Sequence, residues 1–117
     1  MTNDPKACMT MAVETLLEKK GQEVLALDIS AISTLADYFI IAHGISEVHV
    51  QALADEVQNK LHDAGYIMKS KAGYREAKWV LLDFYDVVIH IFSPQDRHYY
   101  MLERLWADAP ALTFERS

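Results

Sequence analysis

Cysteine, glycine and proline are all scarce in this chain of 117 residues. The single cysteine, Cys8, excludes an internal disulfide and a zinc site built from cysteines. It lies among the apolar positions of a predicted helix, so we expect a small buried hydrophobic side chain. Four glycines and three prolines, with no repeat or low-complexity segment, leave nothing that resembles an interdomain linker. We therefore expect residues 1–117 to form one domain around one core.

Long apolar runs are also absent. No run approaches the roughly 18 residues needed to cross a bilayer, and Met1–Lys6 lacks the basic-then-apolar order of a secretory signal. We expect a cytoplasmic protein with no membrane partner.

Basic residues are outnumbered, with eleven against seventeen acidic residues and a formal net charge of -6. Binding to a phosphate backbone is driven by Lys and Arg releasing counterions, so this balance disfavours direct nucleic-acid binding. An acidic surface suits a basic protein partner better.

Helical periodicity predicts three helices. The first follows the N-cap Asp4 and runs from Pro5 to about Gly21. The second lies between the cap Ser46 and Gly65, with apolar residues at helical spacing: Val50, Leu53, Ala54, Val57 and Leu61. A third, over 94–106, carries a stripe that we expect to pack on the sheet: Tyr99, Tyr100, Leu102, Leu105 and Trp106.

Apolar segments rich in β-branched and aromatic residues predict five strands. They are "EVLALDI" (23–29), "DYFIIAH" (37–43), the start of "YIMKSKAGYREA" (66–77), and the two halves of "KWVLLDFYDVVIHIF" (78–92). A helix between the second and third strands implies a parallel crossover, whereas the last two strands form an antiparallel hairpin. The predicted fold class is α/β, a mixed five-stranded sheet with helices packed on it.

The hairpin sorts its residues onto two faces because side chains alternate along a strand. One face is aliphatic, and we expect it to contact the helices: Val80, Leu82, Val87, Ile89 and Ile91. The other face is mixed: Trp79, Leu81, Asp83, Asp86, Val88, His90 and Phe92. A two-residue loop at Phe84 and Tyr85 would place Asp83 opposite Asp86 and Trp79 opposite His90. A bulge at the turn would instead move His90 to the aliphatic side.

Three blocks of the sequence resemble the ribosomal silencing factor family, also called Iojap-like. They are "DYFIIAHGIS" (37–46), "WVLLDFYDVVIHIF" (79–92) and "YYMLERLW" (99–106), supported by the shorter "LALD" and "ALADEV". In this order they are highly specific, and the resemblance covers nearly all of 24–110.

The resemblance implies a nucleotidyltransferase-like fold without the corresponding catalytic site. It further implies a protein that docks on the large ribosomal subunit through ribosomal protein fourteen, obstructs joining of the small subunit and lowers translation when nutrients are scarce. It implies no cofactor and no enzymatic activity.

Two positions depart from the family pattern. Tyr85 occupies a turn position that is usually glycine, so a positive φ there would cost about 1 kcal/mol. His43 replaces a Ser or Thr, which removes a hydroxyl.

The mixed face and the resemblance together predict a docking surface. We expect an apolar centre with acids at the rim that meet Lys or Arg of the partner. The predicted contacts are Glu76, Trp79, Leu81, Asp83, Tyr85, Asp86 and His90. For Trp79 a core position is the alternative, and His90 is as well explained by a structural hydrogen bond as by a partner contact. A homodimer that covers the same apolar, aromatic face is a second expectation.

A nucleotidyltransferase-like enzyme or nucleotide-binding protein is the main alternative function. Gly44-Ile45-Ser46 lies where such a site would hold phosphates, but no Asp-x-Asp or Asp-x-Glu strand follows, and Asp83 and Asp86 flank a turn instead.

Metal and nucleophile sites have weaker support. His43 could lie near His49, and His90 near His98, yet no pair has His-x-x-x-His spacing. Cys8 has no candidate base nearby in the sequence, and no Gly-x-Ser-x-Gly elbow exists.

Overall fold

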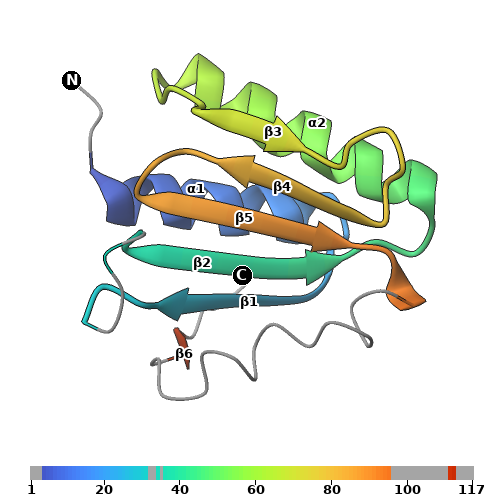
Figure 1. Ribbon diagram of the computed structural model, residues 1–117, viewed down its shortest axis with the longest axis horizontal. Helices are drawn as coiled ribbons and strands as arrows, with labels where there is room; N and C mark the ends of the chain where they lie inside the picture. Colours follow the sequence, from blue (N-terminus) through green and yellow to red (C-terminus); the bar gives the residue numbers. More distant parts are fainter. Residues whose placement is uncertain (1–3, 32–33, 35, 96–110, 113–117) are drawn as a thin grey trace.

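The computed structural model describes residues 4–31, 34, 36–95 and 111–112. Their elements, in chain order, are α1 (Pro5–Glu18), β1 (Gln22–Asp28), β2 (Tyr38–His43), α2 (Glu47–Asp63), β3 (Ser70–Ala72), β4 (Trp79–Asp83), β5 (Val87–Phe92) and β6 (Ala111–Leu112) (Figure 1). None of the helices in this part of the chain is long and apolar enough to cross a membrane.

The strands form one mixed sheet in the order β3-β4-β5-β2-β1-β6. β2 and β5 are parallel, and every other neighbouring pair is antiparallel. The parallel pair requires the chain to cross over between β2 and the β4–β5 hairpin, and α2 lies in that connection. The predicted α/β class with a mixed sheet is confirmed.

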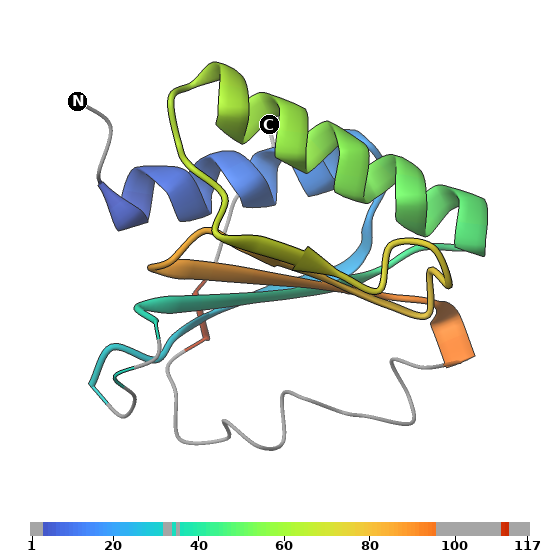
Figure 2. The ribbon, with the colours of Figure 1, turned by 45° about the horizontal axis from the view of Figure 1, so that its top comes forward.

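Both helices cover the same face of the sheet (Figure 2). We call this the inner face and the opposite side the outer face. The aliphatic side of the hairpin packs against α1 and α2 on the inner face, as predicted. The residues that form this core include Leu16, Leu53, Val57, Val80, Leu82, Ile89 and Ile91, each at most 1% exposed.

The two long helices begin at the predicted caps. Asp4 accepts a hydrogen bond from the backbone N of Lys6 at 3.0 Å, and Pro5 takes the first helical position. Ser46 caps α2 by accepting from the backbone N of His49 at 3.1 Å.

The strands of the structure differ from the prediction in two respects. The third strand is confined to Ser70–Ala72, and the two-residue β6 adds a sixth strand that no sequence signal indicated. In the predicted helix over 94–106, Pro94 and Gln95 are helical, while the remainder, with its aromatic stripe and His98, lies outside the described residues.

The predicted hairpin register is wrong by two residues. Asp83 pairs with Val88, Leu81 with His90, and Trp79 with Phe92. The physical reason is the position of the turn: Phe84 does not join the loop but donates its backbone N–H to the carbonyl of Val87 at 2.9 Å, with its side chain buried in the helix-side core. A shift of two residues preserves alternation, so the paired side chains stay on the faces predicted for them, whereas Asp86, predicted on the mixed face, lies in the turn and lines a pocket with Cys8 and Phe84.

Candidate protein-docking surface

The outer face of the sheet forms a second apolar cluster, separate from the helix-covered core. Its buried members are Leu27, Ile29, Ala36, Phe39, Ile41, Val88 and Phe92, and Leu25, Trp79 and Leu81 pack against them half-buried. The centre of the mixed face is therefore largely buried. Its side along β4 is partly exposed, and we call this strip, with Trp79 and Leu81 and the exposed residues at either end (Glu76, Tyr85 and Asp86), the β4 margin.

Trp79 and His90 are joined by a hydrogen bond across the two strands. The indole Nε1 of Trp79 lies 3.1 Å from Nδ1 of His90. Indole N–H can only donate, so Nδ1 accepts and the imidazole proton is on Nε2. This contact is diagonal, because the residue directly opposite His90 is Leu81.

Aromatic contacts fix the orientation of the same pair. The ring of Trp79 stacks on Phe92 with centroids 5.1 Å apart and planes inclined by 29°. The ring of His90 lies 4.8 Å from that of Phe39 on β2. Phe39 and Phe92 were not among the predicted site residues, although Phe92 was correctly placed on this face.

His90 is neutral at physiological pH. Its side chain is 4% exposed, and burial lowers its pKa from 6.5 to about 4 because the charged imidazolium would lose its water. Among the described residues, Nε2 has no hydrogen-bond partner. His90 is therefore too buried to contact a partner. Its hydrogen bond to Trp79 fits the second interpretation of this residue, a structural histidine.

The β4–β5 turn carries the most exposed of the predicted contacts. Tyr85 is 54% exposed and has a φ of 70°, a positive value that glycine adopts more readily than any other residue. The backbone N of Asp86 donates to the carbonyl of Phe84 at 2.9 Å, which closes a γ-turn around Tyr85. Asp83, which is half-buried, accepts from the backbone N of Tyr85 at 2.8 Å and steadies this turn.

Asp86 attaches the turn to the start of β2. Its backbone carbonyl accepts from the backbone N of Asp37 at 2.8 Å and from that of Tyr38 at 3.0 Å, while its carboxylate side chain is exposed. Lys69, on the neighbouring connection, holds its ammonium 5.9 Å from the ring centre of Tyr85.

Glu76 lies at the opposite end of β4, in a loop anchored to α2. Gln51 donates to the carbonyl of Tyr74 at 3.0 Å, and the Tyr74 hydroxyl donates to Asp55 at 2.9 Å. Gly73 has a φ of +76°, and an added Cβ would collide with the backbone oxygen of Trp79, so the close approach of loop and strand requires glycine.

The predicted docking residues therefore separate into three groups. Glu76, Tyr85 and Asp86 are exposed; Trp79, Leu81 and Asp83 are half-buried; His90 is buried. The exposed residues bracket β4, whose five residues span about 13 Å. A partner that contacts both ends would also cover Trp79 and Leu81 between them.

The loop Gly44-Ile45-Ser46, which the nucleotide alternative would use to hold phosphates, has a backbone N–H that is already bonded to a side chain of α2. Nδ1 of His49 accepts from the backbone N of Ile45 at 3.0 Å, and Nε2 lies 3.0 Å from the carbonyl of Lys19. His49 thus links the end of α1 to the start of α2. His43 is instead 3.9 Å from Glu23.

The described residues also contain no group of three His, Cys, Asp or Glu side chains arranged to hold a metal ion. The thiol of Cys8 is buried, and its pKa is raised to about 12 by desolvation and by the charge of Asp86, which disfavours the nucleophilic thiolate.

Sequence and structure comparisons cover almost the whole chain. The profile of the family described as "Ribosomal silencing factor during starvation" matches residues 2–117. The chain is 44% identical over 107 residues to ribosomal silencing factor RsfS of Halalkalibacterium halodurans, covering 92% of each. It is also 44% identical over 105 residues to RsfS of Bacillus subtilis, covering 90% of this chain and 89% of that one. A crystal structure of a Chromobacterium violaceum protein matches with a TM-score of 0.87 and 35% identity, over 97% of this chain and 94% of the other.

Proposed function

This chain belongs to the ribosomal silencing factor family, and from that premise we propose that it represses translation by binding the large ribosomal subunit and sterically blocking the small subunit from joining. The contact on the ribosome would be ribosomal protein fourteen, and the repression would operate under nutrient limitation in the cytoplasm. The family match over residues 2–117 is the observation that carries this proposal.

The β4 margin supports a protein partner. It combines exposed Glu76 and Asp86 with the half-buried side chains of Trp79 and Leu81 and the exposed ring of Tyr85. An apolar strip with acids at both ends suits a basic protein, since rim charges raise the rate of association and covered apolar side chains slow dissociation. Steric repression consumes no substrate and needs no cofactor.

The test is a subunit-joining experiment with purified ribosomal subunits. The purified protein should cosediment with large subunits and, when added before small subunits, lower the fraction of complete ribosomes in a sucrose gradient. Protein that fails to cosediment with large subunits, or that cosediments and leaves joining unchanged, would overturn the proposal.

Glu76→Lys tests the surface itself, because Glu76 is exposed and its substitution removes no core contact. We expect weaker large-subunit binding, with the loss greatest at low salt. Glu14→Lys, an equal charge change at an exposed position on α1, is the matched control and should bind normally.

We also propose a homodimer as a state that competes with docking. A second copy could cover Trp79 and Leu81 in place of the ribosome. Light scattering over a dilution series, with and without large subunits, measures this competition. A molar mass equal to that of one chain at every concentration would contradict the homodimer.

A further inference from the structure

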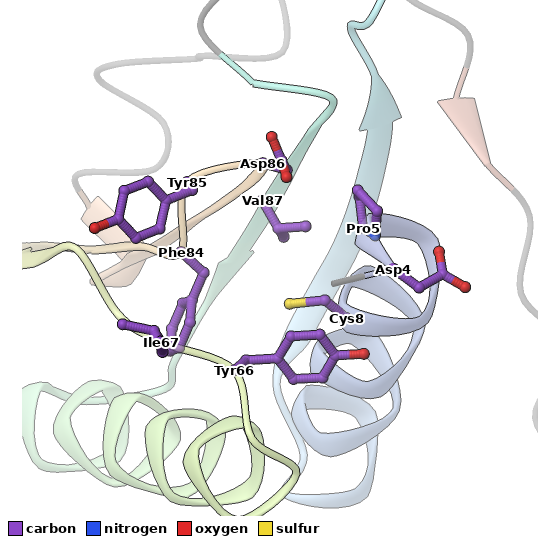
Figure 3. A pocket seen from close by; sticks show the side chains of 9 residues that line it. All are labelled: Asp4, Pro5, Cys8, Tyr66, Ile67, Phe84, Tyr85, Asp86 and Val87. Atoms are coloured by element: carbon purple, nitrogen blue, oxygen red, sulfur yellow. The ribbon is translucent and has the colours of Figure 1, made fainter. Parts of the chain in front are cut away.

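A pocket of about 480 Å³ opens beside the β4–β5 turn, at the end of the molecule where three separate segments meet. These are the start of α1, the α2–β3 connection and the turn itself (Figures 1 and 3). The pocket is lined by Asp4, Pro5, Cys8, Tyr66, Ile67, Phe84, Tyr85, Asp86 and Val87. Its volume is within the range of pockets that hold small ligands.

The floor and walls are apolar. Cys8 is 3% exposed, Val87 1% and Phe84 6%, so the base is continuous with the helix-side core. Figure 3 shows the thiol of Cys8 facing the interior between Val87 and the ring of Tyr66. Such walls accommodate an alkyl chain or the stem of a long side chain.

The polar groups of the lining carry one sign of charge. Asp4 comes from the start of α1 and Asp86 from the β4–β5 turn, and none of the described lining residues is basic. Burial and then Asp86 raise the pKa of Cys8, while burial, Cys8 and Asp4 raise the pKa of Tyr66.

The rim carries two exposed large side chains, Ile67 at 74% and Tyr85 at 54% exposure. An apolar and an aromatic residue that stand out from the surface beside a pocket are typical of a protein–protein contact. Tyr85 also belongs to the β4 margin, so this pocket and the proposed docking surface are continuous.

We infer that this pocket receives a long cationic side chain, arginine or lysine, from the basic protein on which the chain docks. The inference rests on the proposed function for the identity of the partner and on the pocket for the chemistry. The alkyl stem would lie along Pro5, Phe84 and Val87, and the charged end would meet Asp4 and Asp86. The ring of Tyr66 offers a face that attracts a cation, as the ring of Tyr85 does for the ammonium of Lys69, 5.9 Å from its centre.

The first experiment removes both charges without changing shape. In a double variant, Asp4→Asn with Asp86→Asn, asparagine can still cap α1 and the backbone carbonyl of residue 86 still anchors the turn. We expect large-subunit binding to weaken by about tenfold in cosedimentation, with a shallower dependence on salt. Glu14→Gln with Glu18→Gln, both exposed on α1, gives the same change in net charge and should bind within about twofold of the unaltered protein.

The second experiment probes the pocket without the ribosome. Butylguanidinium should produce saturable shifts in the amide signals of Cys8, Tyr66 and Val87 of the full chain, measured by NMR. Butylurea, of similar shape but neutral, should produce none, and the Asp4→Asn, Asp86→Asn variant should lose the response to butylguanidinium.

The two experiments separate the inference from the function on which it rests. Absence of large-subunit binding by the unaltered protein overturns the proposed function, and the titration then decides the pocket alone. Equal binding by the two double variants overturns the pocket as a docking contact. A butylurea response equal to that of butylguanidinium, or no saturable response to either, overturns the cationic assignment.

Discussion

The two faces of the sheet are both buried at their centres, but they are built from different chemistry. Where the hairpin meets α1 and α2, the inner face is aliphatic, through residues such as Val80, Leu82 and Ile89. The outer face places a tryptophan, a histidine and two phenylalanines in one cluster, with a directed hydrogen bond between Trp79 and His90. Aliphatic packing contributes most of the stability, whereas the polar pair fixes the orientation of the rings.

The largest expected difference is between two neighbouring leucines on β4. Leu82→Ala empties a fully buried inner site, and we expect the free energy of unfolding to fall by about 3 to 4 kcal/mol. Leu81→Ala removes the same atoms from a half-buried outer site and should lower it by about 1 to 2 kcal/mol. Urea unfolding monitored by circular dichroism measures both. Equal losses would show that the outer face is as fully packed as the inner one.

The second difference is a pH dependence of stability that His90 gives to the outer face. His90 has a pKa of about 4 in the folded chain and an ordinary value of 6.5 when unfolded. Between these values the unfolded chain binds a proton that the folded chain does not, so stability falls as pH falls from about 7 to about 4. The loss attributable to His90 is roughly 3 kcal/mol, complete below about pH 4.

Carboxylates also titrate in that pH range. The contribution of His90 is therefore measured by comparing the free energy of unfolding of the unaltered protein with that of His90→Phe at each pH. The variant should be less stable at pH 7, because the indole N–H of Trp79 loses an acceptor, but its stability should vary less between pH 6.5 and 4. Parallel pH curves for the two proteins would contradict the assignment.

The smallest expected effect concerns the turn between the two strands. Tyr85→Gly relieves a positive φ and should raise the free energy of unfolding by about 1 kcal/mol, seen as a higher melting temperature. Tyr85→Ala removes the same ring but keeps the strained backbone, so it should give no such rise. Both variants should bind large subunits less well if the ring is a docking contact. A melting temperature raised equally by both would place the effect in the ring and not in the backbone.

Alternation along the strands predicted the two faces of the hairpin correctly but could not fix its register. Displacing the pairing by two residues leaves the paired side chains on their own faces, so the pattern is the same for both registers. The burial of Phe84 decided between them, and an aromatic residue next to a turn gives no local sign of whether it joins the loop or the core.

The burial of His90 and the pocket beside the turn were beyond sequence reasoning for a related reason. Periodicity tells which side of a sheet a residue faces but not what lies over that side, so the acidic and aromatic pattern alone could not distinguish a covered His90 from an open one. The pocket joins Cys8, Tyr66 and Phe84 from three distant segments, and no local pattern links them. The strong caps at Asp4 and Ser46, by contrast, are local features, and both helices begin where they predict.

The carbonyl of Asp86, which holds the backbone N–H groups of both Asp37 and Tyr38, has a consequence for the thermodynamics of association. Asp37 in turn accepts from the backbone N of Ile29 at the end of β1, so a chain of amides runs from the exposed turn across the sheet. A loop tip held in this way is preorganised: it loses little conformational entropy when a partner settles on it. A partner that docks on this turn would therefore be met without a slow rearrangement of the loop, and the rate of encounter would be set by diffusion and charge.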